Sequence, residues 1–200
     1  AGLLIRFPDW ARWLRDETDL EQPRTAEELD REFAVALEDL PGERERRLAA
    51  LRCARRELLR LGARRILDYS DENAMTAELS ELASATLRLA LEEAGRPLRE
   101  RFGEPLDEAE EGRRGKRRPA RFTVIAMGKL GGRELNFSSD IDLLFLYSEE
   151  GLTTGQADGA GRITNHQYFT RLAEGLIRYL SEVSEEGFFY RVDTRLRPDG

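Results

Sequence analysis

Two aspartates one residue apart, Asp140 and Asp142, have the type and spacing best suited to chemistry in this sequence. On an extended strand, residues i and i+2 point to the same side and lie roughly 6–7 Å apart, so both carboxylates can reach one divalent ion or a close pair of ions. Hard oxygen ligands suit Mg²⁺ or Mn²⁺. The pair therefore predicts a divalent metal site, although two aspartates in this pattern also occur on solvated strand faces.

A glycine-rich segment lies upstream of the aspartates and predicts an anion site. The apolar run of residues 122–127 has the character of a strand and stops at Gly128, where backbone N–H groups can turn towards a phosphate. Lys129 adds a compact positive charge, as other phosphate-binding lysines do. Only two lysines occur among the 32 lysine and arginine residues, so this one is hard to attribute to chance. A glycine-rich turn taken alone is nevertheless a weak signal of function.

A third carboxylate, Asp193, lies in a segment whose residues alternate between apolar and charged. This alternation over residues 188–197 predicts a strand with one polar face, formed by Arg191, Asp193, Arg195 and Arg197. On one reading Asp193 completes the metal site or acts as a base, while Arg195 and Arg197 hold phosphate oxygens bidentately. On the other reading the same face is an ion-paired surface stripe. Both readings can hold for different arginines.

The order of these features resembles the DNA polymerase β-like nucleotidyltransferase superfamily, in which a glycine turn follows one strand and an acidic pair opens the next. The resemblance implies an α/β (α+β) nucleotidyltransferase core with a mixed sheet, preceded by an α-helical region. It also implies catalytic and metal-binding roles for Asp140, Asp142 and Asp193. The phosphate- and nucleotide-binding residues that it implies are Gly128, Lys129, Gly131, Gly132, Ser139, Arg195 and Arg197. One departure is Lys129, which stands where the superfamily usually has a serine.

Three longer motifs narrow the resemblance to one family. They read GKLGGRELNFSSDIDLLFLY from Gly128, YFTR from Tyr168 and GFFYRVDTRLRPDG from Gly187. They resemble the bifunctional glutamine synthetase adenylyltransferase/adenylyl-removing enzyme family, densely over residues 122–200 and more loosely before. That family has two nucleotidyltransferase domains in tandem: the first removes AMP from a tyrosine of glutamine synthetase by phosphorolysis and releases ADP, and the second attaches AMP from ATP. The residue types at 136–139 and the motif from Gly187 resemble those of the first, adenylyl-removing copy.

The resemblance further implies glutamine synthetase as the protein substrate, a PII signalling protein as a partner, and orthophosphate, ADP, ATP and glutamine as small molecules. Two alternatives stay open. The first alternative is that the chain is the adenylylating copy or another nucleotidyltransferase. From a different class, a catalytically silent module that binds glutamine synthetase or PII also fits the sequence.

The first hundred residues or so are expected to form helices that precede this core. A capping box at Thr25 and Glu28 opens a first helix, which ends at Pro41 and Gly42. A second helix begins near residue 43, and a third covers about residues 71–94. The second carries arginines four residues apart, which favour a solvated or partner-paired surface over a phosphate contact; they are Arg52, Arg56, Arg60 and Arg64.

Composition sets the expected domain organisation. Residues 1–103 are predicted to form the helical region, residues 104–120 a charged linker, and residues 121–200 the catalytic core, truncated at its C-terminus. The linker prediction rests on an acidic block followed by a basic block. A second glycine-rich connection is expected over residues 151–161. The sole histidine, His166, is expected to open a helix rather than to bind a ligand.

Charge and hydropathy exclude several classes of protein. The net charge of −7 argues against a general nucleic-acid binder, whose footprint would be basic. No apolar run approaches ~18 residues, the length of a membrane span, and the first residues do not resemble a secretory signal. The single cysteine, Cys53, excludes an internal disulfide and a site with several cysteine ligands. These features predict a cytoplasmic protein that binds neither nucleic acid nor membranes.

Overall fold

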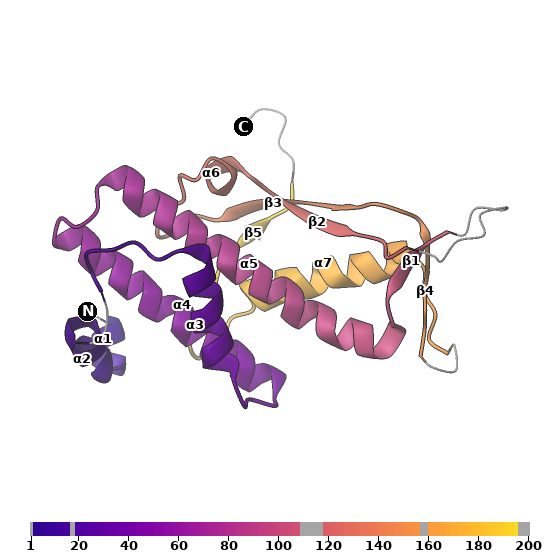
Figure 1. Ribbon diagram of the computed structural model, residues 1–200, viewed down its shortest axis with the longest axis horizontal. Helices are drawn as coiled ribbons and strands as arrows, with labels where there is room; N and C mark the ends of the chain where they lie inside the picture. The colour runs from indigo at the N-terminus through magenta and orange to yellow at the C-terminus, as the bar shows by residue number, and fades with distance from the viewer. Residues whose placement is uncertain (1, 17–18, 109–117, 157–159, 196–200) are drawn as a thin grey trace. The chain divides into compact units, whose positions relative to one another are not determined.

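A computed structural model describes residues 2–16, 19–108, 118–156 and 160–195 (Figure 1). Its contacts divide the chain into two compact units. The helical unit comprises Ala1–Thr86, Gly128–Ser139 and Val183–Phe189. The sheet unit comprises Leu87–Met127, Asp140–Glu182 and Tyr190–Gly200. The two units are described separately below, and the domain boundaries predicted at residues 103 and 120 stay a prediction.

The helical unit is formed largely by segments of the first 86 residues. Its helices are α1 (Gly2–Arg6), α2 (Asp9–Asp16), α3 (Ala26–Leu37), α4 (Glu43–Ile66), the start of α5 (Glu72–Phe102) and the single turn α6 (Gly128–Gly131). The predicted capping box is present, because the Thr25 hydroxyl accepts from the Glu28 N–H and the Glu28 carboxylate accepts from the Thr25 N–H. The helix starts predicted at Thr25 and near residue 43 are confirmed by α3 and α4.

The core of the helical unit consists of the apolar faces that the helical periodicity predicts. Leu29, Phe33 and Leu37 of α3 are buried at 3–4% exposure, and α3 packs against α4. Fully buried residues of α4 and α5 continue this core, namely Ala50, Leu51, Leu61, Leu79, Leu82 and Ala83. Burial of such side chains contributes about 1.5–3 kcal/mol each, so these faces stabilise the unit far more than helix propensity does.

The arginine stripe of α4 corrects one expectation. Arg52 and Arg56 are exposed or half-buried, as predicted, but Arg60 and Arg64 are 0% and 3% exposed. Arg60 pairs with Glu57 and with Glu78 of α5, at 2.7 and 3.0 Å. Glu57 lies one turn away on α4 and Glu78 comes from α5, which is why the second half of the stripe belongs to a buried ion network and not to a surface.

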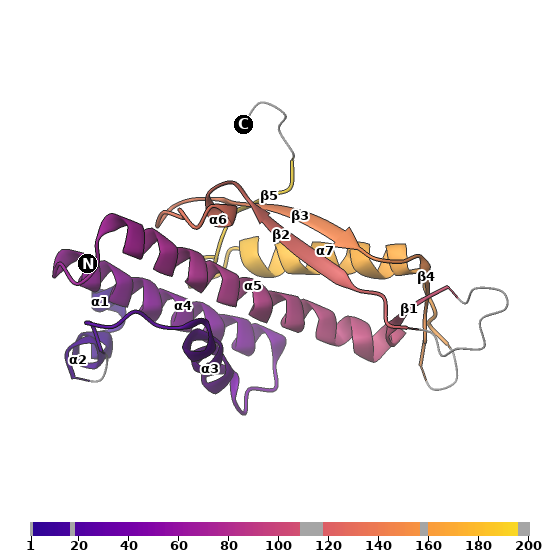
Figure 2. The same ribbon diagram turned by 45° about the horizontal axis from the view of Figure 1, so that its top comes forward.

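The sheet unit contains a mixed three-stranded sheet in the order β2-β3-β5. β2 (Phe122–Met127) and β3 (Ile141–Tyr147) are antiparallel, and β3 and β5 (Val192–Asp193) are parallel. Helix α7 (Asn165–Ser181) lies along one face of this sheet (Figures 1 and 2). This arrangement confirms the predicted fold class of helices with a mixed sheet.

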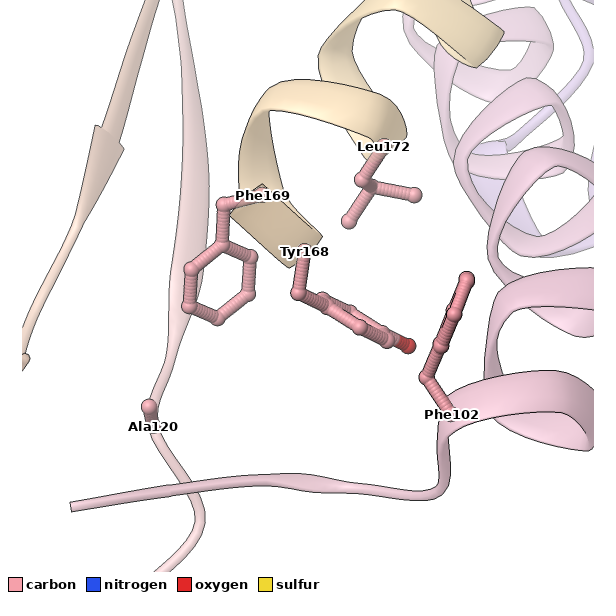
Figure 3. Close-up of a cluster of buried hydrophobic side chains, with 5 residues drawn as sticks. All are labelled: Phe102, Ala120, Tyr168, Phe169 and Leu172. Carbon is pink, nitrogen blue, oxygen red and sulfur yellow. The ribbon is translucent and has the colours of Figure 1, made fainter. Parts of the chain in front are cut away.

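Aromatic contacts hold α7 on the sheet. The Phe169 ring stacks on Phe122 of β2 and on Tyr147 of β3, with ring centroids 5.5 and 5.3 Å apart. The neighbouring Tyr168 contacts the Phe169 ring edge-on and faces Phe102 at the end of α5 (Figure 3). Burial in this cluster raises the pKa of Tyr168 to about 12. The buried apolar residues of α7 recur at spacings of three and four, as in a helix with one covered face.

Two short strands occur where the sequence predicts connections. β1 (Pro105–Asp107) lies in the expected linker and pairs antiparallel with β4 (Gly151–Thr153), which lies in the expected glycine-rich loop. The buried Asn165 amide at the start of α7 donates 2.9 Å hydrogen bonds to the carbonyls of Leu106 and Glu149. Because the Asn165 side chain pairs with both carbonyls, it holds β1 and the segment that follows β3 beside α7. Residues 109–117 of the linker and 157–159 of the loop lie outside the described residues.

Two elements have lengths different from those predicted. The third helix, expected to end near residue 94, continues through Pro97 to Phe102, because Leu98 and Phe102 pack in the cluster beside α7. Of the strand predicted over residues 188–197, the described part, up to residue 195, is extended in a sheet only at Val192–Asp193. Its earlier part is diverted, since the Tyr190 N–H donates to the Leu180 carbonyl at the end of α7 and not to a strand. None of the described helices is long and apolar enough to cross a membrane.

Candidate functional site

Two of the predicted acidic residues lie side by side in the sheet unit. In the parallel pairing of β3 with β5, Asp142 is the register partner of Asp193, and Ile141 is the partner of Val192. Neighbouring strands lie about 4.8 Å apart, and register partners present their side chains on the same face. Two carboxylates from distant parts of the sequence are therefore next to each other at this end of the sheet.

Strand alternation decides which face carries these acids. Ile141 and Leu143 are 0% and 2% exposed and form the face covered by α7, so Asp142 points to the opposite face, where it is exposed. Asp140 directly precedes β3 and is also exposed. Among the described residues, neither carboxylate has an ion-pair or hydrogen-bond partner. Both are free to accept ligands from solvent.

Asp193 is engaged differently. Its Oδ1 accepts from the backbone N–H and the Nε of Arg195 at 2.8 and 3.0 Å, and its Oδ2 accepts from Nη2 at 2.8 Å. The hydrogen bonds and the charge of Asp193 raise the pKa of Arg195. Because the Arg195 side chain is 73% exposed, the pair is a surface ion pair, which solvent screens and which adds little to stability. Arg195 and Asp193, which were both predicted to belong to the site, are thus bound to each other.

The three carboxylates are the type of ligand that suits a hard divalent ion, but their side chains do not surround a common point in this structure. Among the described residues, no three aspartate, glutamate, histidine or cysteine side chains are grouped closely enough to hold a metal ion. The backbone nevertheless places Asp142 beside Asp193, and Asp140 lies two residues before Asp142.

The glycine segment belongs to the helical unit and forms a tight helical turn. Gly128 has a φ of 53°, a left-handed conformation that favours glycine, and the Gly132 N–H donates to its carbonyl at 2.9 Å. Leu130 is buried at 5% exposure and anchors the turn. Lys129 is exposed and forms no ion pair with any carboxylate in the described part of the chain. Its ammonium group is therefore available to an anion.

The remaining predicted residues have mixed positions. Gly131 and Gly132 are exposed at the end of the α6 turn. The hydroxyl of Ser139 accepts a 3.3 Å hydrogen bond from the Asn136 N–H, so it closes the local turn before the aspartates. Arg197 lies outside the described residues.

An apolar surface beside the acids was not predicted. On the face that carries Asp142, the side chains of Ile125, Met127 and Leu146 are 36–48% exposed. Met127 is the register partner of Asp142, and Ile125 pairs with Leu144. The signal was present in the sequence, because residues 124–127 are apolar at every position although only alternate ones can face α7.

The structure has an exposed acidic pair at the end of a mixed sheet, and a helix covers the opposite face of that sheet. This is the α/β fold that the resemblance to nucleotidyltransferases predicts. The family model described as glutamate-ammonia ligase adenylyltransferase matches residues 1–200. The chain therefore belongs to the glutamate-ammonia ligase adenylyltransferase family.

Curated relatives carry the same kind of name. The chain is 38% identical over 202 residues to the bifunctional glutamine synthetase adenylyltransferase/adenylyl-removing enzyme of Thioalkalivibrio sulfidiphilus, covering 100% of the chain and 20% of that relative. It is 41% identical over 169 residues to the enzyme of the same name from Nitrosomonas europaea, covering 84% of the chain and 17% of the relative. The chain thus spans about a fifth of the length of these relatives.

Proposed function

We propose that this chain is the adenylyl-removing part of a bifunctional enzyme that acts on glutamine synthetase. The observation that carries the proposal is the register pairing of Asp142 with Asp193 on an exposed sheet face, with Asp140 two residues away. The names of the relatives support an adenylyltransferase that acts on glutamine synthetase. The adenylyl-removing reaction, rather than the adenylylating one, rests on the motif spelling at residues 136–139 and 187–197.

The proposed reaction is a phosphorolysis. An oxygen of orthophosphate attacks the phosphorus of the AMP group, the bond from that phosphorus to the tyrosine oxygen breaks, and the phenolate leaves and takes up a proton. The products are ADP and unmodified tyrosine. Two anions must meet in this step, so charge neutralisation is the main requirement on the protein.

The residues proposed to meet this requirement are the three aspartates, Lys129 and Arg195. Asp140, Asp142 and Asp193 would hold Mg²⁺ or Mn²⁺, which supplies Lewis-acid stabilisation of the phosphoryl oxygens and of the departing oxygen. Asp193 orients Arg195 through two hydrogen bonds to its guanidinium, so this planar donor is presented in one direction. The exposed apolar side chains of Ile125 and Met127 offer a surface for the rest of the substrate.

The released nucleotide decides between the two copies. The full-length protein that contains this chain is mixed with adenylylated glutamine synthetase, orthophosphate and Mg²⁺, with Asp142→Asn in the full-length protein as the variant. We expect ADP to form with the parent and not with the variant. The opposite result would be transfer of AMP from ATP to unmodified glutamine synthetase by the parent, and loss of that transfer in Asp142→Asn. It would assign this chain to the adenylylating copy.

Lys129→Ala is expected to raise the concentration of orthophosphate needed for half-maximal rate by about tenfold, since one charge-assisted contact to the small anion is lost. The concentration of protein substrate needed for half-maximal rate should change little. Initial rates measured at a series of phosphate concentrations test this, and Arg65→Gln, the loss of an exposed charge elsewhere, is the matched control. An unchanged phosphate dependence would remove Lys129 from the mechanism.

A catalytically silent binding module is the second candidate, and the Asp193–Arg195 pair favours it. In that case the paired carboxylate is structural and no metal is bound. Titration with Mn²⁺, followed by thermal unfolding, separates the two candidates. Stabilisation that disappears in Asp142→Asn supports the enzyme, and equal behaviour of parent and variant supports the module.

A further inference from the structure

The helical unit contains a pocket of about 580 Å³ that the proposed reaction does not use. Residues from α2, α3 and α4 line it, together with Phe7 in the turn before α2. Its volume lies within the range of roughly 300–1,000 Å³ typical of pockets for small organic ligands. The pocket is therefore large enough for one compact molecule.

Most of the lining is apolar, and its aromatic part is already ordered. The rings of Phe7 and Trp10 stack with centroids 4.2 Å apart and planes inclined by 15°. Cys53 is buried, and desolvation raises the pKa of its thiol to about 12, so it presents an uncharged sulfur to the pocket. Ala36 and Ala49 leave the space open on the α3 and α4 sides. This lining favours a flat apolar body.

The charged lining is cationic on balance. Three arginines face the pocket, and the one carboxylate in its lining, Glu32, pairs with Arg56 at 2.8 Å. Arg52 pairs with the buried Glu186 at 2.8 Å. Arg31 forms no salt bridge with any carboxylate among the described residues. The neighbouring Glu28, one turn earlier on α3, is occupied by the capping box at Thr25.

We propose that this pocket binds a small organic anion with a flat apolar body, such as an aromatic carboxylate or sulfonate. Its ring system packs against the Phe7–Trp10 pair, and its anionic group pairs with Arg31. Arg31 is the cation that carries the specificity, because Arg52 and Arg56 already have carboxylate partners. The site is independent of the three aspartates and of the proposed phosphorolysis.

Two fluorescent probes of nearly the same shape test the charge requirement. They are the anionic 8-anilinonaphthalene-1-sulfonate and its neutral analogue N-phenyl-1-naphthylamine. The only two tryptophans of the chain, Trp10 and Trp13, lie at or next to the pocket, and Trp13 is contacted by Arg56 at 4.8 Å. Energy transfer from tryptophan therefore reports binding near α2, and the pocket variants below assign that binding to this pocket. We expect the parent to bind the sulfonate at least about tenfold more tightly than the neutral probe.

Arg31→Gln should weaken binding of the sulfonate by about tenfold and leave the neutral probe unchanged, since only the ion pair is lost. Arg65→Gln removes an exposed charge of the same kind outside the pocket and should change neither affinity. Ala36→Leu fills the pocket from α3 and should weaken both probes, with circular dichroism confirming the fold. Equal affinity of the parent for the two probes, or sulfonate binding that survives Arg31→Gln, would overturn the proposal. These two outcomes do not depend on whether Ala36→Leu folds.

Discussion

Arg60→Met should lower the free energy of unfolding by about 3–5 kcal/mol, because it removes a fully buried cation that two buried carboxylates share, and each of those carboxylates keeps only one other partner, Arg24 or Arg64. Arg60 is 0% exposed, and Glu57 and Glu78 are 4% and 9% exposed. Burial lowers the pKa of Arg60, but its hydrogen bonds to Glu57 and Glu78 outweigh that effect and raise it. The guanidinium is therefore charged in the folded protein, and its loss is a loss of charge.

Chemical denaturation at a series of pH values measures this effect. Arg65→Met on the same helix is the matched control, because Arg65 pairs with an exposed Asp68 at 3.4 Å and should cost no more than about 1 kcal/mol. In Arg60→Met the buried Glu57 and Glu78 carboxylates lose one of their cationic partners, so uptake of a proton in the folded state becomes less unfavourable. The stability deficit should therefore be full at neutral pH and shrink as the pH falls. A deficit that is small, or independent of pH, would mean that the network contributes little.

The network also ties the segment before α3 to α4, together with the ion pair of Arg24 with Glu57 at 3.2 Å. Arg60 donates to the Gln22 carbonyl at 3.1 Å, and Arg64 donates to the Leu20 carbonyl. These bonds fix the segment between α2 and α3 to α4, and they satisfy carbonyls that would otherwise be unpaired. Loss of Arg60 is thus expected to loosen the part of the chain that carries Trp10 and Trp13.

Local signals in the sequence predicted the elements whose structure depends on local contacts. The capping box at Thr25 requires only residues three apart, and the covered face of α7 follows from helical periodicity. The fate of Arg60 could not be predicted in this way. Its burial depends on Glu78 of another helix and on a carbonyl at Gln22, neither of which is marked by spacing along α4.

The candidate site shows the same division between local and long-range information. The exposure of Asp142 follows from alternation with Ile141 and Leu143. That Asp193 lies beside Asp142 is a matter of strand register between distant segments, and the sequence indicated it only through a family resemblance. The length of β5 was predicted wrongly, because a periodic pattern does not reveal that the Leu180 carbonyl takes the Tyr190 N–H.

Asp142→Asn should abolish turnover, by at least about a hundredfold, without destabilising the metal-free protein. Asp142 has no ion pair to lose among the described residues, and neutralising it relieves repulsion with its register partner Asp193. The unfolding temperature without metal should be unchanged or slightly raised. Asp68→Asn, at a fully solvated carboxylate 91% exposed, is the control and should leave both rate and stability unchanged.

Asp193→Asn and Arg195→Gln, measured as a pair, decide what Asp193 does. Because Arg195 is 73% exposed, loss of their ion pair should change stability little, so stability alone does not separate a metal ligand from a structural partner. Stabilisation by Mn²⁺ does separate them, since a ligand present at a hundred times its dissociation constant stabilises by about 2.7 kcal/mol. We expect Asp193→Asn to lose both this stabilisation and activity. Arg195→Gln should keep or strengthen Mn²⁺ binding, because it frees the carboxylate, while it weakens the use of phosphate. Full Mn²⁺ stabilisation and full activity in Asp193→Asn would show instead that the carboxylate serves only to hold Arg195.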